Sequence, residues 1–317
     1  MNILPDIQLA NQRIDPYILR TPVEYSPYLS KMCEAEVWLK LEHLQITGSF
    51  KLRGATNKVL SLSDAEKKRG VITASTGNHG SAFAYIADKL NCKGSIYLPP
   101  SAAKTKVEMM RMYRVDLEFF GKDSVDAELE AKRVAEEEGQ LFLSPYNDLE
   151  IVAGQGTIGA ELEEQVPEMD SVLVPVGGGG LISGIAGYLK ARKPDIEVIG
   201  CQPANSAVMY ESIKAGEILD IESLPTLSDG TAGGMEPDSI TFDMCKAWVD
   251  DYIVVSEEEI RAGLRFLLEK HYFMVEGAAA LSVASLLQQK HRFKGKSVVL
   301  ILCGRKLGLE TLKEILS

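Results

Sequence analysis

From about Val71 onward, short apolar runs alternate with segments that have the periodicity of a helix. This alternation constrains the fold strongly, because it is typical of parallel sheets whose strands are connected by covering helices. The runs that predict strands form two series, VITAS, SIYLPP, DLEFFG and LFLSPY, and then SVLVPV, EVIGCQP, DYIVVS and SVVLILC. We therefore expect an α/β protein with two open, twisted α/β domains.

The length of the chain fits such a pair of domains. With 317 residues it can bury roughly three quarters of its unfolded surface and form about two domains. We expect residues 65–147 to form a small domain, and residues 1–64 and 148–317 to form a large one together. The stretch from Gly216 to Asp238 lacks periodicity and is predicted to run as loops, whereas residues 257–271 predict an amphipathic helix.

The charge and the cysteines limit the partners and the compartment. A net charge of -11 and a pI near 5.0 argue against nucleic acids and anionic membranes, which select clustered basic residues. No stretch approaches the roughly 20 apolar residues of a membrane span, and no basic segment followed by an apolar run opens the chain. Because its scattered cysteines form no C-x-x-C pair, we expect reduced thiols and a cytoplasmic protein; they are Cys33, Cys92, Cys201, Cys245 and Cys303.

Lys51 stands among small residues and beside an aromatic one, in the run TGSFKLRG. Most lysines are simply solvated charges. A lysine buried in a pocket has a lowered pKa instead, and only its neutral amine forms an imine with an aldehyde cofactor. Lys51 is therefore the candidate for a covalent bond to such a cofactor.

Two glycine-containing runs each follow a predicted strand and precede a helix. STGNHG, residues 75–80, is explained equally well by a helix cap with a tight turn and by a site that offers hydroxyls and N–H groups to a carboxylate. The second run is Gly177–Gly180, four consecutive glycines. Since so many glycines are costly in ordered backbone, this run indicates a phosphate-binding loop at a helix N-terminus.

A third run, Gly154–Gly159, matches the G-x-G-x-x-G fingerprint of dinucleotide-binding proteins. The fingerprint also needs an acidic residue at the end of the next strand, and SVLVPV ends in a glycine instead. We therefore favour packing and turn roles for these glycines. The four histidines show no metal-ligand spacing, so no metal is expected.

Taken together, these motifs resemble the fold type II pyridoxal-phosphate enzymes, and most closely the threonine/serine dehydratase and serine racemase family. The resemblance spans nearly the whole chain and rests on GSFKLRGA, STGNHG, AGQGTIG, VPVGGGGLISG, EGAAA from Glu276, and the strand that ends at Cys303. It implies a fold like that of the tryptophan synthase β chain, with pyridoxal 5'-phosphate in the cleft between the two domains.

The resemblance also implies roles for individual residues. Lys51 would hold the cofactor as a Schiff base, Phe50 would pack on its ring, and Asn78 would bond its phenolic oxygen. The phosphate would lie on Gly177, Gly178, Gly179 and Gly180. Cys303 would lie beside the pyridine nitrogen and Glu276 would line the same pocket, while the substrate carboxylate would be surrounded by Ser75, Thr76, Gly77 and His79.

The implied function is that of an ammonia-lyase, which converts a small β-hydroxy amino acid such as L-serine or L-threonine to a 2-keto acid and ammonia. Lys51 would remove the Cα proton. The Thr76 hydroxyl could serve as a base on the opposite face, so a serine or other amino-acid racemase remains an alternative, as does a β-replacing synthase. From other classes, an NAD-dependent dehydrogenase and a catalytically silent amino-acid-binding protein remain open. Relatives suggest a homodimer.

Two departures from the family pattern bear on metal and substrate. Where racemases place an acidic pair for a divalent cation, this chain has Gln202 and Val208, so no helper metal is expected. The loop from Ser228 to Gly234 differs from that of threonine-specific enzymes. The substrate side chain therefore stays open.

Overall fold

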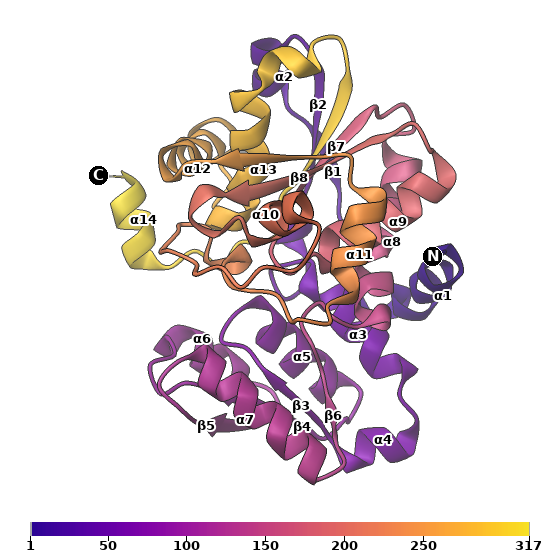
Figure 1. Ribbon diagram of the computed structural model, residues 1–317, viewed down its shortest axis with the longest axis vertical. Coiled ribbons are helices and arrows are strands. Elements are labelled where there is room, and N and C mark those ends of the chain that lie inside the picture. The colour runs from indigo at the N-terminus through magenta and orange to yellow at the C-terminus, as the bar shows by residue number, and fades with distance from the viewer. Residues whose placement is uncertain (1, 317) are drawn as a thin grey trace.

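Two sheets form the framework of the protein, which a computed structural model describes over residues 2–316 (Figure 1). The six-stranded sheet has the order β1-β2-β10-β7-β8-β9 and the four-stranded sheet the order β5-β4-β3-β6. All neighbouring strands are parallel except β1 and β2. The strands are β1 (Val23–Tyr25), β2 (Glu36–Lys40), β3 (Val71–Ala74), β4 (Gly94–Leu98), β5 (Asp116–Phe119), β6 (Leu141–Phe142), β7 (Ser171–Pro175), β8 (Glu197–Pro203), β9 (Asp251–Val255) and β10 (Ser297–Ile301). The predicted α/β fold with two sheets is confirmed.

Helices from distant parts of the sequence cover the larger sheet. α8 (Leu149–Gln165) and α9 (Gly180–Arg192) lie side by side, and α1 (Leu4–Ile14) packs against both. α13 (Gly277–Gln288) packs on β7 to β10 and is itself covered by α12 (Glu257–His271), the helix that the sequence predicts. The remaining helices of this part are α2 (Pro27–Cys33), α10 (Val208–Ala215), α11 (Ile240–Trp248) and α14 (Leu309–Leu316).

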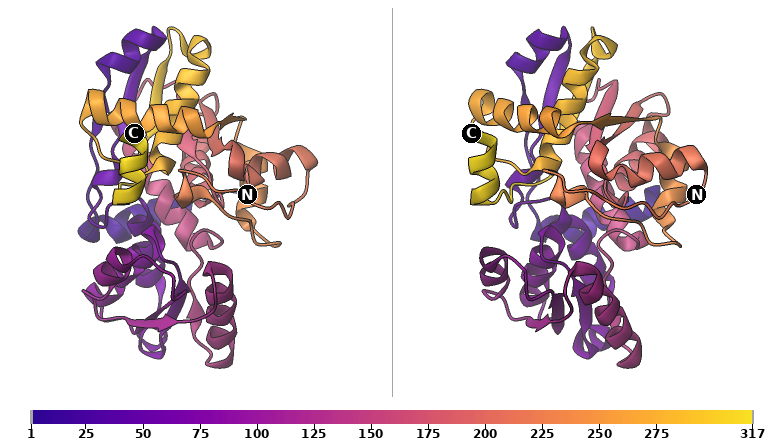
Figure 2. Two further views of the ribbon diagram at one scale, coloured as in Figure 1. Left: turned by 90° about the vertical axis from the view of Figure 1, so that its left-hand side faces the viewer. Right: turned by 60° about the vertical axis from the view of Figure 1, so that its left-hand side comes forward.

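The smaller sheet and its helices form the lower part of the molecule in all three views (Figures 1 and 2). α7 (Ser124–Glu137) packs on this sheet, and α4 (Asp64–Arg69), α5 (Asn78–Lys89) and α6 (Lys104–Met110) complete the unit. α3 (Lys51–Ser61) contacts both α5 and α8, so it joins the two parts. All strands of the smaller sheet fall between residues 65 and 147, while the domain boundaries themselves remain a prediction.

The structure adds to the predicted strands at one place and shortens them at another. β1 and β2 are not predicted, and β2 ends in a fully buried lysine, Lys40. The run LFLSPY is predicted to be a strand, but β6 stops at Phe142 and the residues after it turn toward a cavity. Within residues 2–316, no helix is long and apolar enough to cross a membrane.

The carboxyl ends of three strands position the predicted motifs. β3 leads into Ser75, β7 into the glycine run at Gly177, and β10 into Cys303. Ligands of open α/β sheets bind beyond the carboxyl ends of parallel strands. Both sheets therefore present their motifs where a ligand site is expected.

Candidate active site

A cavity of about 410 Å³ brings together all the site residues that the sequence predicts. This volume is in the usual range for small-molecule sites. The predicted residues on its wall are Phe50, Lys51, Ser75, Thr76, Gly77, Asn78, His79, Gly177, Gly178, Gly179, Gly180, Glu276 and Cys303. Their placement is thus observed, while their individual roles remain predictions.

Lys51 is the first residue of α3, and its side chain reaches into the cavity. Its Nζ donates a hydrogen bond to the carbonyl oxygen of Pro145 at 2.8 Å and lies 5.2 Å from the centre of the Phe50 ring. Burial lowers the pKa of Lys51 to about 8, although Cys303 and Glu276 act in the opposite direction. At neutral pH this amine is therefore uncharged far more often than a solvated lysine.

The glycine run forms a tight loop between β7 and α9. A Cβ on Gly178 would lie 2.5 Å from the Tyr146 ring, and Gly179 has a φ of 86°, so side chains are excluded by packing and by conformation. Among residues 2–316, the N–H groups of Gly177, Gly178 and Gly179 find no acceptor. Free N–H groups at the start of a helix form a site for an anion.

Asn78 and Glu276 meet across the cavity although they are far apart in the sequence. The amide nitrogen of Asn78 donates to both carboxylate oxygens of Glu276 at 2.9 Å, and the Oδ1 of Asn78 is buried without a partner in the described chain. Burial raises the pKa of Glu276. A Cβ on Gly304 would lie 2.4 Å from a Glu276 oxygen, so the residue after Cys303 has to be small.

Cys303 lies directly beside this carboxyl group, with its Sγ 3.9 Å from Oε1 of Glu276. Burial, and after it the charge of Glu276, raises the pKa of the Cys303 thiol well above its usual value. The thiol is therefore neutral at physiological pH and can be only a weak partner for a ring nitrogen.

His79 is buried and uncharged at neutral pH. Burial and the charge of Lys51 lower the pKa of His79 to about 3. Its Nε2 lies 3.3 Å from the carbonyl oxygen of Leu143, so the proton of the neutral ring belongs on Nε2 and Nδ1 is left as an acceptor without a partner in residues 2–316. The neighbouring hydroxyl of Ser75 accepts from the N–H of Gly77 and shapes the loop.

The cavity also contains residues that sequence reasoning missed. Tyr146 supports the glycine loop, and its hydroxyl accepts a hydrogen bond from the N–H of Glu236. Lys106 and Lys306 reach the cavity from different parts of the molecule. Lys306 follows Cys303 by three residues, which is a signal the sequence offered; nothing near Lys106 in the sequence marks it.

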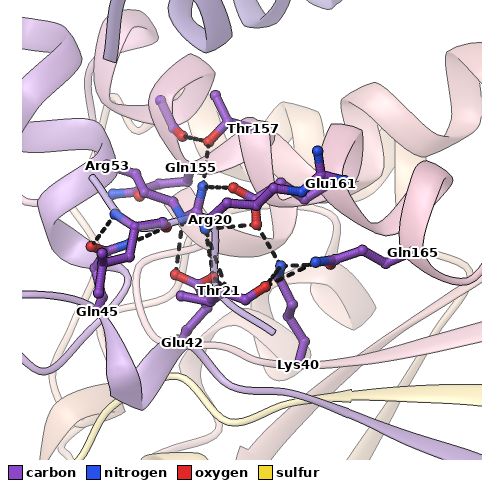
Figure 3. A network of polar contacts seen from close by, with 12 residues as sticks. Arg20, Thr21, Lys40, Glu42, Gln45, Arg53, Gln155, Thr157, Glu161 and Gln165 are labelled. Atoms are coloured by element: carbon purple, nitrogen blue, oxygen red, sulfur yellow. Dashed lines mark hydrogen bonds and ion pairs between the residues drawn. The ribbon is translucent and has the colours of Figure 1, made fainter. Parts of the chain in front are cut away.

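A buried polar network holds the start of α3 (Figure 3). The guanidinium of Arg53 pairs with Glu42 at 2.8 Å and with Glu161 at 2.7 Å, and Glu161 also pairs with the buried Lys40. Burial alone would raise the pKa of Glu42, but Arg53 and Lys40 outweigh it and lower that pKa. Because two cations face two carboxylates, the network is balanced in charge, and it fixes the backbone two residues from Lys51.

The G-x-G-x-x-G run lies inside α8 and not in a turn. A Cβ on Gly154 would lie 2.6 Å from the backbone of Gly54 in α3, and one on Gly156 would collide with Ile7 of α1. These glycines permit close helix packing, as predicted, but the expected turn is absent. A dehydrogenase site based on this run has no structural basis.

Gln202, one of the two positions at which the sequence departs from the racemase pattern, has a structural role. Gln202 is buried; its Oε1 accepts from the N–H of Tyr210 and its Nε2 donates to the carbonyl of Val176. No group of three or more potential metal-ligating side chains was found in the described part of the chain.

Comparisons with known families, curated relatives and solved structures agree with one another. Residues 14–304 match the family model described as "Pyridoxal-phosphate dependent enzyme". The chain is 39% identical to an L-threonine ammonia-lyase of Thermotoga maritima, over 100% of this chain and 79% of that one. It is 38% identical to the catabolic L-threonine dehydratase of Escherichia coli K12, over 98% and 95%. The structure of maize serine racemase has a TM-score of 0.92 at 33% identity, covering 99% and 96%.

Proposed function

The chain belongs to the family of pyridoxal-phosphate dependent enzymes, and from this premise we propose that it is an ammonia-lyase acting on β-hydroxy amino acids such as L-serine or L-threonine. The products are a 2-keto acid and ammonia. The observation that carries the proposal is the desolvated amine of Lys51 in one cavity with an anion-binding glycine loop. The relatives named as threonine ammonia-lyase and threonine dehydratase support the choice of reaction.

The residues present fit pyridoxal phosphate. Its aldehyde would meet the Lys51 amine, and its phosphate would meet the unpartnered N–H groups of Gly177–Gly179. The buried Oδ1 of Asn78, which has no partner in the described chain, would serve a polar substituent of the ring, and the neutral thiol of Cys303 would serve its nitrogen. When bound, the cofactor withdraws electrons from Cα of the attached amino acid and so acidifies the Cα proton.

Residues of the chain carry out the remaining steps of the reaction. The loop from Ser75 to Gly77 holds the substrate carboxylate near the start of α5 through the Ser75 hydroxyl and backbone N–H groups, because the helix end favours an anion. Lys51, with its lowered pKa, removes the Cα proton as a general base. The hydroxyl group leaves Cβ with a proton as water, and hydrolysis of the resulting enamine gives the keto acid and ammonia.

The reaction is tested by incubating the holoenzyme with L-serine and L-threonine and measuring keto acid, ammonia and the D-enantiomer together. We expect keto acid and ammonia in equal amounts. A catalytically silent binding protein would form neither product, and a β-replacing synthase would need a second nucleophile. Absence of keto acid from every β-hydroxy amino acid would contradict the proposal.

The same incubation tests the racemase alternative. Two observations favour this alternative: the Thr76 hydroxyl lies in the cavity, and the chain is similar to maize serine racemase. Thr76→Ala should remove any D-enantiomer while most elimination persists, because elimination needs only the Lys51 side of Cα. Equal loss of both products would instead assign Thr76 to carboxylate binding.

We also infer a cytoplasmic homodimer. All five cysteines are free, which is typical of a reducing compartment. The half-exposed ring of Tyr28 lies edge-on to that of His271, with 6.1 Å between the ring centres, and the next residue along the chain, Tyr272, is 87% exposed. Such patches often mark interfaces.

Light scattering should give twice the 34.7 kDa of one chain, because the patch would be covered by a second copy. Replacing Tyr28 and Tyr272 by serine should shift the mass toward one chain. Leu309→Ser, which changes an exposed residue on α14, is the matched control. A single-chain mass for the native protein would rule out the dimer.

A further inference from the structure

Two lysines line the cavity from its two sides. Lys106 belongs to α6 of the smaller unit, and Lys306 follows β10 of the larger one. The Nζ of Lys306 is buried and has no hydrogen-bond partner within residues 2–316. The Nζ of Lys106 lies 3.5 Å from Oδ2 of Asp229, a carboxylate that is 64% exposed.

The ammonium group of Lys306 is poorly compensated by the protein. Burial, and to a smaller extent the charges of Lys106 and Arg305, lower the pKa of Lys306 to about 8, although the charge of Glu276 acts in the opposite direction. The charge of Glu276 therefore partly compensates Lys306, but no hydrogen bond joins the two side chains in residues 2–316, and the Glu276 oxygens accept from the Asn78 amide and from the backbone N–H of Lys306. A buried cation without a bonded anion is costly unless a ligand supplies the anion.

The other anions of the proposed reaction already have places elsewhere in the cavity. The cofactor phosphate is assigned to Gly177–Gly179, and the substrate α-carboxylate to the loop from Ser75 to Gly77. The wall near Lys306 takes neither role. There a Cβ on Gly230 would lie 3.3 Å from Oε1 of Glu276, so the loop after Asp229 lies beside the same carboxyl group. Neither of these two anions therefore compensates Lys306, and the substrate side chain is the remaining part of the ligand that can.

We propose that Lys306, assisted by Lys106, binds an anionic group on the substrate side chain. The preferred substrates are then β-hydroxy amino acids with a second carboxylate, of which 3-hydroxyaspartate is the smallest. This inference rests on the proposed function and narrows its substrate class. Because the two lysines come from different units, one carboxylate between them also bridges the cleft and relieves their repulsion.

Binding is tested first, with ligands that have no β-hydroxyl to lose. Changes in the visible spectrum of the holoenzyme are titrated with L-aspartate and with L-alanine. We expect L-aspartate to bind at least about tenfold more tightly than L-alanine, as a charge-assisted contact allows. In Lys306→Met, which removes the charge and leaves an unbranched side chain that is only one atom shorter, this ratio should fall to about one.

Two further variants distinguish the effect of the charge at Lys306 from a general effect of a substitution on the structure. Lys306→Arg retains the cation and should keep part of the preference for L-aspartate. Lys104→Met removes an exposed lysine of the same helix as Lys106 that does not line the cavity, and it should leave the ratio unchanged. If Lys306→Met weakens both ligands equally, the lysine binds the α-carboxylate and the inference is wrong.

Turnover is then compared for the stereoisomers of 3-hydroxyaspartate, L-serine and L-threonine. We expect a kcat/KM for one stereoisomer at least about tenfold above that for L-serine, and loss of this advantage in Lys306→Met. Activity toward L-serine that responds to inorganic phosphate through Lys306 would show a separate effector anion and overturn the inference.

The outcomes also separate this inference from the proposed function. Keto acid from L-serine without any preference for a second carboxylate would overturn the inference alone. Tighter binding of L-aspartate through Lys306, without keto acid from any β-hydroxy amino acid, would support the anion site and contradict the ammonia-lyase function.

Discussion

Replacing Lys51 by alanine is expected to lower keto-acid production by at least about 1,000-fold, because the variant loses both the covalent anchor and the general base. The visible absorption of the bound cofactor should disappear with it. Keto acid is measured by a coupled assay, and borohydride reduction followed by peptide mapping identifies the modified lysine in the native protein. Lys68→Ala, an exposed lysine of α4, is the control and should retain full activity.

The pH dependence of cofactor attachment supplies an independent check on Lys51. Burial lowers the pKa of Lys51 to about 8, and only the neutral amine attacks an aldehyde. Attachment of pyridoxal phosphate to the apoprotein should therefore accelerate as pH rises through about 8 and level off above it. A rate that keeps rising to the usual lysine pKa, or reduced cofactor on a different lysine, would contradict the assignment.

The second large effect is expected at Arg53. Arg53→Met should lower the free energy of unfolding by about 3–5 kcal/mol, because it leaves the carboxylates of Glu42 and Glu161 buried without their main partner. Urea denaturation followed by circular dichroism measures this loss. Activity should fall as well, since the network holds the backbone two residues from Lys51.

An exposed arginine provides the comparison for Arg53. Arg133 of α7 also pairs with two carboxylates, but its side chain is 52% exposed, so water replaces the lost contacts. Arg133→Met should therefore cost far less stability. Adding Glu42→Gln and Glu161→Gln to Arg53→Met should restore part of the loss, since neutral amides are less costly to bury than unpaired carboxylates. Equal effects of Arg53→Met and Arg133→Met would show that the buried network is not important for stability.

The sequence by itself determined the strands, turns and helix starts, because these features depend on residues that are close together in the chain. The apolar runs predicted eight of the strands, since burial on both faces of a parallel sheet leaves a continuous apolar signal. The Gly177–Gly180 run and STGNHG were placed correctly after their strands because a strand, a turn and a helix N-terminus are local features.

Only the tertiary structure decided which distant residues meet. Asn78 and Glu276 are 198 positions apart, and their contact depends on how two sheets are placed on either side of one cavity. β2 was not predicted because its charged ends suggest an exposed segment. In the structure Lys40 is buried, and its ammonium group is paired with Glu161. Lys106 likewise looks like an ordinary surface lysine in the sequence, and the closeness of Lys306 to Cys303 in the sequence does not show that its amine is buried. What distinguishes Lys306 is that its buried Nζ has no hydrogen-bond partner among the residues that the structure describes, and this is a property of packing in three dimensions that no local sequence pattern contains.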